Sequence, residues 1–258
     1  RRQRQMCIRD STKAEGTVVQ GGIEEGEWKF YNENGTLVQI VNYSFGEFNG
    51  PYKSFSEEGV LIEEGFFKNA IRDSEFKTNY PNGKIQLKGF YKDGFKDSLW
   101  SSFYQNGNKK MEGFYLKDKR IGVWKFWYQN NQLKKEVEYK DGEGLVKSFY
   151  NQKGVKQLTN GTGKFVDLNS NNVKVQEGEY LNGKPTGKWR EWSEEEILKS
   201  VQTYKDGIAN GLWSLYYDNG KLNWEGSYSK NKKSGPWKYY YEDGTDSQAE
   251  FYENGKLN

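Results

Sequence analysis

Aromatic residues recur along this chain at a fixed spacing of 24 residues. Seven of the eight steps between successive lead aromatics are 24 residues, and the other, from Trp124 to Phe165, is 41 and holds a degenerate unit around Val146. Such a period is typical of repeat proteins, in which each unit buries its apolar surface against its neighbours. The lead aromatics, called position 0 below, are Trp28, Tyr52, Phe76, Trp100, Trp124, Phe165, Trp189, Trp213 and Trp237.

The residues between the lead aromatics predict β-hairpins. A second aromatic usually stands at position +3, a turn dipeptide such as Asn106-Gly107 at +6 and +7, an aliphatic residue at +9 and a third aromatic at +15. Asn-Gly between short aromatic and β-branched runs is a strong hairpin signal, and no 3.6-residue periodicity is sustained. We therefore expect an all-β fold of ten hairpin-like units, with no helix longer than about two turns.

A two-residue type I′ turn at +6 and +7 would fix the strand register, because both central residues of this turn take positive φ. Position +4 would face +9, +1 would face +12, and 0 would face +13. This register places Lys53 opposite Glu64 and Trp213 opposite Gly226. Basic residues at +1 would then meet glutamates at +12, and each lead aromatic would lie over the glycine facing it.

A second turn, such as Asp93-Gly94, leads from each unit to the next. Successive hairpins are therefore predicted to pair edge to edge into an elongated repeat array with one continuous, twisted or curled antiparallel sheet. Residues 142–172 break the period, and the loss of aromatic residues there predicts a thinner sheet. Residues 15–22 resemble the second half of a unit, so we expect the array to be truncated at one or both ends.

Residues 1–11 resemble the in-frame translation of a transposase adapter, so we expect a non-native segment followed by a single repeat array over residues 12–258. Without this segment the chain loses four arginines, one aspartate and its single cysteine, Cys7. The balance of 39 basic and 36 acidic residues then becomes 35 of each. The array is therefore expected to be neutral overall, which makes nucleic acid an unfavoured partner.

The composition argues against catalysis. The chain has no histidine, which is the commonest general base and metal ligand, and the acidic residues follow the repeat instead of forming an isolated pair. We therefore expect no enzyme activity, no cofactor and no metal site. Aromatic residues make up 17% of the chain and it contains 30 glycines, while no apolar run reaches the ~18 residues that a membrane span needs.

The pattern Gly-x-Trp-x-x-Tyr/Phe-Tyr-x-Asn-Gly-x-Leu, followed by Tyr-x-Asp/Asn-Gly, resembles the MORN repeat variant of bacterial antitoxin-like proteins. Residues 211–222 and 235–244 match it best, and the resemblance extends over residues 15–258. It implies a sheet built from hairpins and a role in interaction, either antitoxin-like or associated with the bacterial envelope. The compartment stays open between envelope and cytoplasm.

Two classes of function follow. The first is a non-catalytic scaffold that binds a protein partner. The second is a module that binds carbohydrate or an anionic lipid surface through its aromatic and lysine rows. In both cases we expect the ligand to contact the +3 aromatics, because they alternate in parity with position 0 and should face outward beside the lysines. The candidate binding residues are Phe103, Trp127, Trp192, Tyr216 and Tyr240.

Overall fold

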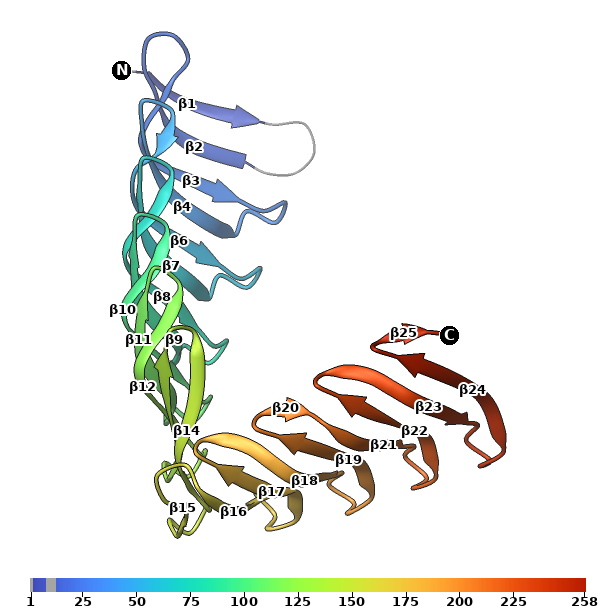
Figure 1. Cartoon of the computed structure of the whole chain (residues 1–258). Coiled ribbons are helices and arrows are strands. Elements are labelled where there is room, and N and C mark those ends of the chain that lie inside the picture. Colours follow the sequence, from blue (N-terminus) through green and yellow to red (C-terminus); the bar gives the residue numbers. More distant parts are fainter. Residues whose placement is uncertain (1, 8–12) are drawn as a thin grey trace. The chain divides into compact units, whose positions relative to one another are not determined.

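The computed structural model describes residues 2–7 and 13–258, and within these residues the chain forms strands and turns without a helix. The strands pair antiparallel in the order of the chain, apart from two short strands beside the main path and one break, and they form two open sheets (Figure 1). This confirms the all-β array of hairpins. By their internal contacts the residues divide into two compact units, Arg1–Asn131 with Tyr139–Glu143, and Gln132–Glu138 with Gly144–Asn258.

The first sheet follows the order of the chain, with the short strand β5 beside β4. Its strands are β1 (Arg2–Cys7), β2 (Lys13–Val18), β3 (Glu24–Tyr31), β4 (Leu37–Ser44), β5 (Glu47–Phe48), β6 (Gly50–Phe55), β7 (Leu61–Lys68), β8 (Ile71–Asn79), β9 (Ile85–Lys92), β10 (Phe95–Phe103), β11 (Lys109–Leu116), β12 (Lys119–Trp127), β13 (Leu133–Lys140), β14 (Glu143–Tyr150) and β15 (Lys156–Leu158).

The second sheet also follows the chain, with β20 beside β19. Its strands are β16 (Gly163–Leu168), β17 (Lys174–Leu181), β18 (Lys184–Trp192), β19 (Leu198–Lys205), β20 (Ile208–Ala209), β21 (Gly211–Tyr216), β22 (Leu222–Ser229), β23 (Lys232–Tyr240), β24 (Asp246–Glu253) and β25 (Lys256–Leu257).

The prediction of one continuous sheet is wrong, because the ladder stops between β15 and β16 within the irregular stretch 142–172. Only an isolated bridge, Thr159 with Thr162, follows β15. Here the backbone of β14 bonds to two turns instead of a strand: the N–H of Gly161 donates to the Lys147 carbonyl over 2.8 Å, and the N–H of Val146 donates to the Gly183 carbonyl over 3.1 Å. These groups are therefore not available to extend the ladder.

The predicted register is confirmed in the body of the hairpins. Lys53 pairs with Glu64, and Trp213 pairs with Gly226. The turn that produces this register differs from the prediction. Of the two turn residues, only the one at +7, usually glycine, takes positive φ. Its N–H donates to the carbonyl of +4, as Gly107 does to Tyr104 over 2.8 Å.

The loop therefore has three residues, +5 to +7, and the N–H of +4 donates to the carbonyl of +8 instead of pairing with +9. Position +3 pairs with +9, as Phe55 does with Leu61, and one extra residue at +10 then restores the predicted pairing of +2 with +11. The turn with two positive φ values occurs elsewhere. It is the second turn, as at Asp206 and Gly207, with φ of 52° and 83°.

Of the predicted adapter segment, residues 2–7 form β1, which pairs with β2, while residues 1 and 8–11 lie outside the described residues. The adapter origin stays a prediction.

Candidate functional site

Each sheet has two chemically different faces, because successive side chains of a strand point to opposite sides. Positions 0, +2, +11 and +15 share one face, called the tryptophan face here. Positions −1, +1, +3, +12 and +14 share the other, called the lysine face. The lead aromatics are buried as predicted, apart from the half-buried Trp213, and Trp124 is completely inaccessible to solvent.

The tryptophan face is largely satisfied by its own packing. The ring of Trp124 lies between two +15 tyrosines, edge-on to Tyr115 at 4.9 Å and to Tyr139 at 6.1 Å between centroids. Its indole N–H donates to the carbonyl of Phe114 over 3.2 Å. Trp237 repeats this packing with Tyr228 and Tyr252. Aromatic packing of this kind leaves little of the tryptophan face for a ligand.

The predicted relation between lead aromatics and glycines is only partly right. A Cβ added at Gly113 would overlap the ring of Trp124, which belongs to the following repeat, although Gly113 pairs in register with Trp100. The same displacement by one repeat joins Gly89 with Trp100, and Gly226 with Trp237. Among the +13 glycines, Gly65 differs, because it is covered by Tyr52 of its own hairpin.

A row of cations on the tryptophan face was not found in the sequence analysis. Position −4 is basic in four repeats, and each of these side chains lies over aromatic rings. Arg120 lies 4.5 Å from the Trp124 centroid, and Lys233 lies 4.1 Å from that of Trp237. The signal was in the sequence, because the four residues recur at one position: Arg72, Lys96, Arg120 and Lys233.

The five candidate binding residues lie on the lysine face, and all are half-buried. Phe103 and Trp127 belong to one compact unit, and Trp192, Tyr216 and Tyr240 belong to the other. The backbones of Phe103, Trp127 and Tyr240 are held by tyrosines at +4 of the preceding repeat. The hydroxyl of Tyr104 donates to the Trp127 carbonyl over 2.8 Å, and that of Tyr217 donates to the Tyr240 carbonyl over 2.7 Å.

Lysines lie over several of these rings. The Nζ of Lys174 lies 4.2 Å from the centroid of Trp192, and that of Lys109 lies 5.2 Å from the centroid of Trp127. The same two lysines form ion pairs with glutamates at +12, Lys174 with Glu177 over 3.2 Å and Lys109 with Glu112 over 2.7 Å.

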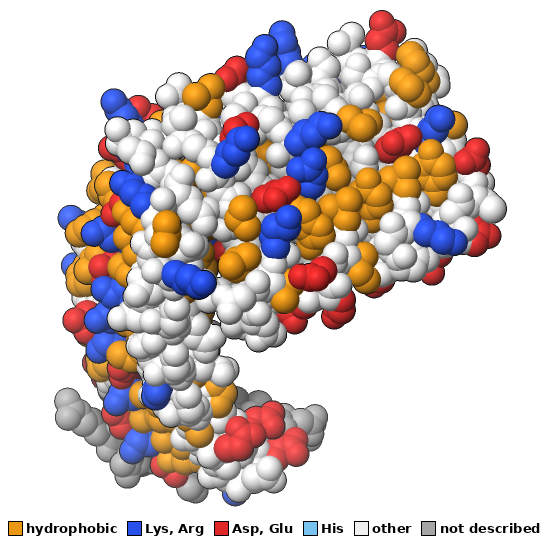
Figure 2. Space-filling view, turned by 90° about the horizontal axis from the view of Figure 1, so that it is seen from below, with side chains coloured by type: hydrophobic (Ala, Val, Ile, Leu, Met, Phe, Trp, Pro, Cys, Tyr) orange, Lys and Arg blue, Asp and Glu red, His pale blue; other side chains and the backbone are white. Residues whose placement is uncertain are grey.

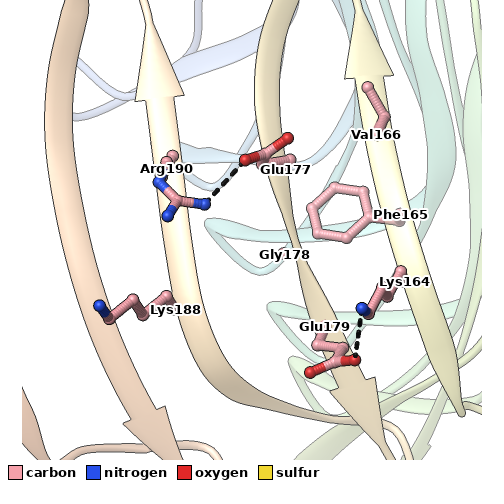
Figure 3. A pocket seen from close by; sticks show the side chains of 8 residues that line it. All are labelled: Lys164, Phe165, Val166, Glu177, Gly178, Glu179, Lys188 and Arg190. Carbon is pink, nitrogen blue, oxygen red and sulfur yellow. Dashed lines mark hydrogen bonds and ion pairs between the residues drawn. The ribbon is translucent and has the colours of Figure 1, made fainter.

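Hollows of this face lie between its charged rows. One, of about 370 Å³, lies over Gly178 and is lined by Lys164, Lys188 and Arg190 (Figure 3). Arg190 pairs with Glu177 over 2.9 Å. Burial raises the pKa of the Glu177 carboxyl, but hydrogen bonds from Lys174 and Arg190 outweigh burial and hold this pKa below its usual value.

A second hollow, of about 310 Å³, lies in the other compact unit between Pro51, Phe66 and Phe90. Its lining is more apolar, and its charged border includes the pair Lys77 with Glu64 at 3.8 Å. Hydrophobic side chains gather in bands beside charged ones on the molecular surface (Figure 2). Both hollows are open and shallow, which suits contact with a partner surface better than enclosure of a small molecule.

Within the described residues, no group of three or more Asp, Glu, His or Cys side chains could hold a metal ion. No helix there is long and apolar enough to cross a membrane.

The family model described as "MORN repeat variant" matches six segments of the chain, and each contains most of one 24-residue unit. The matched residues are 24–44, 48–69, 72–93, 96–117, 120–141 and 209–230. The chain belongs to the MORN repeat variant family. MORN repeats make this protein a repeat scaffold of the kind that commonly serves in binding.

The other comparisons add little. No curated protein matches the chain. Among solved structures, those of TcdB2-TccC3-Cdc42 and TcdB2-TccC3 match 95% and 97% of it, at 11% and 13% identity and TM-scores of 0.18 and 0.17. The chain spans 15% and 14% of the length of those chains. Such TM-scores support no inference about fold or function.

Proposed function

We propose that this MORN repeat protein is a non-catalytic scaffold whose lysine face binds a protein partner. The observation that carries the proposal is the difference between the two faces. The tryptophan face buries its aromatic residues within the sheet, whereas the lysine face keeps the +3 aromatics half-exposed and carries large apolar residues in contact with solvent. Half-exposed aromatics on a rigid sheet give contact area at low entropic cost, which suits protein recognition.

The lysine face fits protein better than carbohydrate, and its +1 row fits protein better than anionic lipid. Stacking of a sugar needs a free ring face, but Lys174 lies over Trp192 and Lys109 over Trp127. Binding of anionic lipid needs lysines that are not already neutralised. At +1, Lys77 and Arg190 each pair with a glutamate. The antitoxin-like and envelope-associated roles stay predictions from the family resemblance.

Site-specific photo-crosslinking tests the proposal. The crosslinking residue p-benzoylphenylalanine would replace Trp127 in one variant, Trp192 in a second and Phe45 in a third. Phe45 is the control, because it is 86% exposed and lies in the turn between β4 and β5, away from the lysine face. We expect a discrete protein adduct from positions 127 or 192 in cells that produce the chain, and none from position 45. Adducts of equal yield at all three positions, or none at any, would overturn the proposal.

A further inference from the structure

Six large apolar side chains form an exposed patch on the lysine face of one compact unit. Each is at least 40% exposed, and adjacent strands β10, β11 and β12 contribute two each. The cross-strand pairs Leu99 with Phe114 and Phe114 with Ile121 join the three strands. The residues of this apolar patch are Phe95, Leu99, Phe114, Leu116, Ile121 and Val123.

The repeat itself does not require these residues. In β17 and β18 the positions equivalent to Phe114, Ile121 and Val123 hold Glu179, Thr186 and Lys188. The fold is the same in both places, so a polar residue is compatible with each position. The patch is therefore a property of this part of the array and not a condition of its stability.

The surroundings of the apolar patch are basic. Residues 84–125 contain ten lysines and arginines, of which Lys96 and Arg120 lie on the tryptophan face, against four aspartates and glutamates. This segment has a net charge of +6, whereas the rest of residues 12–258 carries −6. Lys92 stands across from Phe95, and Lys119 stands across from Leu116. Both lysines are exposed, and neither forms an ion pair within the described residues. A partner that covers the patch would therefore gain from carboxylates at its margin.

The size of the apolar patch points to one element of secondary structure. Three strands spaced ~4.8 Å apart extend about 10 Å, and the four-residue step from Phe95 to Leu99 extends about 13 Å. An α-helix is about 10–12 Å wide and covers 13 Å in about nine residues. The exposed apolar area is on the order of 500 Å², taking about 200 Å² for each side chain, which is below the ~800 Å² per partner of a standard stable dimer.

A helix also fits the hydrogen bonding. The backbone groups of β11 are already bonded to β10 and β12, so a partner cannot add a strand here. A helix satisfies its own backbone and offers only side chains.

We propose that this apolar patch binds an acidic amphipathic helix of another protein, packed along the strands. The apolar side of the helix would cover Leu99, Phe114 and Val123, and its carboxylates would meet Lys92 and Lys119. This inference rests on the proposed scaffold function and names the class of partner.

Selection from a phage-displayed library of random 16-residue peptides on the full chain tests the inference. Counter-selection uses Phe114→Ser, and the control variant is Phe251→Ser. Phe251 occupies the same position, +14, and is equally exposed, 52% against 51% for Phe114. We expect enriched peptides with apolar residues at i, i+3 or i+4 and i+7 and a net negative charge. They should bind Phe114→Ser at least tenfold more weakly than the parent chain, and Phe251→Ser unchanged.

Other results overturn the inference. These are basic or non-helical consensus sequences, binding that does not depend on Phe114, or no enrichment. Self-association lost in Phe114→Ser would assign the patch to a second copy of the chain. Phe114-dependent binding to phosphatidylserine vesicles without peptide binding would assign it to a membrane. If the crosslinker at position 127 or 192 gives a protein adduct but the peptide selection fails, the helical partner is rejected and the scaffold function stands. If crosslinking and selection both fail, the scaffold function and the helical partner are both rejected.

Discussion

Trp124 covers Gly113, a glycine that belongs to the preceding repeat and is paired in register with Trp100. Gly113 therefore contacts two tryptophans: its backbone pairs with that of Trp100, and the Trp124 ring packs where a side chain would stand. Because this contact crosses a repeat boundary, it couples adjacent hairpins of the array.

The substitution Gly113→Ala should destabilise the protein by about 2–3 kcal/mol, because the added Cβ overlaps the buried indole of Trp124. Chemical denaturation measures this loss. In a Trp124→Leu background the same substitution should cost much less, whereas in a Trp100→Leu background it should stay costly. If the pattern is reversed, it is the register partner that covers the glycine.

Tyr217→Phe should lower the free energy of unfolding by about 1 kcal/mol, because it removes the hydrogen bond from the Tyr217 hydroxyl to the Tyr240 carbonyl. Tyr241 is the matched control. It also occupies +4, is 57% exposed, and has no hydroxyl partner within the described residues. Thermal unfolding of Tyr241→Phe should match that of the parent chain. Equal losses in both variants would mean that ring packing, not the hydrogen bond, explains the effect.

Lys233→Met should destabilise the protein by about 1–2 kcal/mol, because the Lys233 Nζ lies over Trp237 and donates to the hydroxyls of Tyr239 and Tyr252. Lys233→Arg should retain most of the stability, since it keeps the charge. The exposed neighbour Lys232 offers the control, Lys232→Met, for which denaturant midpoints should not change. A loss of stability in both Lys233→Met and Lys232→Met would show a general effect of charge.

Stability should fall in alkali through Tyr180. Burial, then the neighbouring Tyr204 and Asp167, raise the pKa of its hydroxyl from 10.0 to about 12. Above pH 10 the unfolded chain releases this proton while the folded chain keeps it, so the contribution of Tyr180 is complete below pH 10 and is lost as the pH rises to about 12.

Denaturation of Tyr180→Phe and of the parent chain across pH 9–12 measures this effect. The variant should show a shallower fall in stability than the parent. Parallel curves would show that the Tyr180 hydroxyl ionises equally in the folded and unfolded states.

Local chemistry explains what the sequence predicted correctly. The alternation of aromatic and polar residues fixes which side chains share a face, and short turns, most of them with a glycine, end the strands. Strand order and the pairing of Lys53 with Glu64 therefore follow from neighbours in the chain. The outward direction of Trp127 and Trp192 follows from the same parity.

The prediction of a two-residue turn was wrong, although it too concerned only local sequence. A two-residue turn and a three-residue turn with an added bulge give the same pairing of 0 with +13, so pairing patterns cannot distinguish them.

Tertiary structure decided what depends on the space between repeats. The sequence placed Gly113 opposite Trp100, but only packing shows that the wider ring of Trp124 lies over it. The end of the first sheet lies where the backbone of Val146 and Lys147 bonds to the turns at Gly183 and Gly161, which the period does not predict. The apolar patch exists because Leu99, Phe114 and Ile121, up to 22 residues apart in sequence, become neighbours through strand pairing. Repeat position sets the direction of each side chain, and the contacts between strands set what it meets.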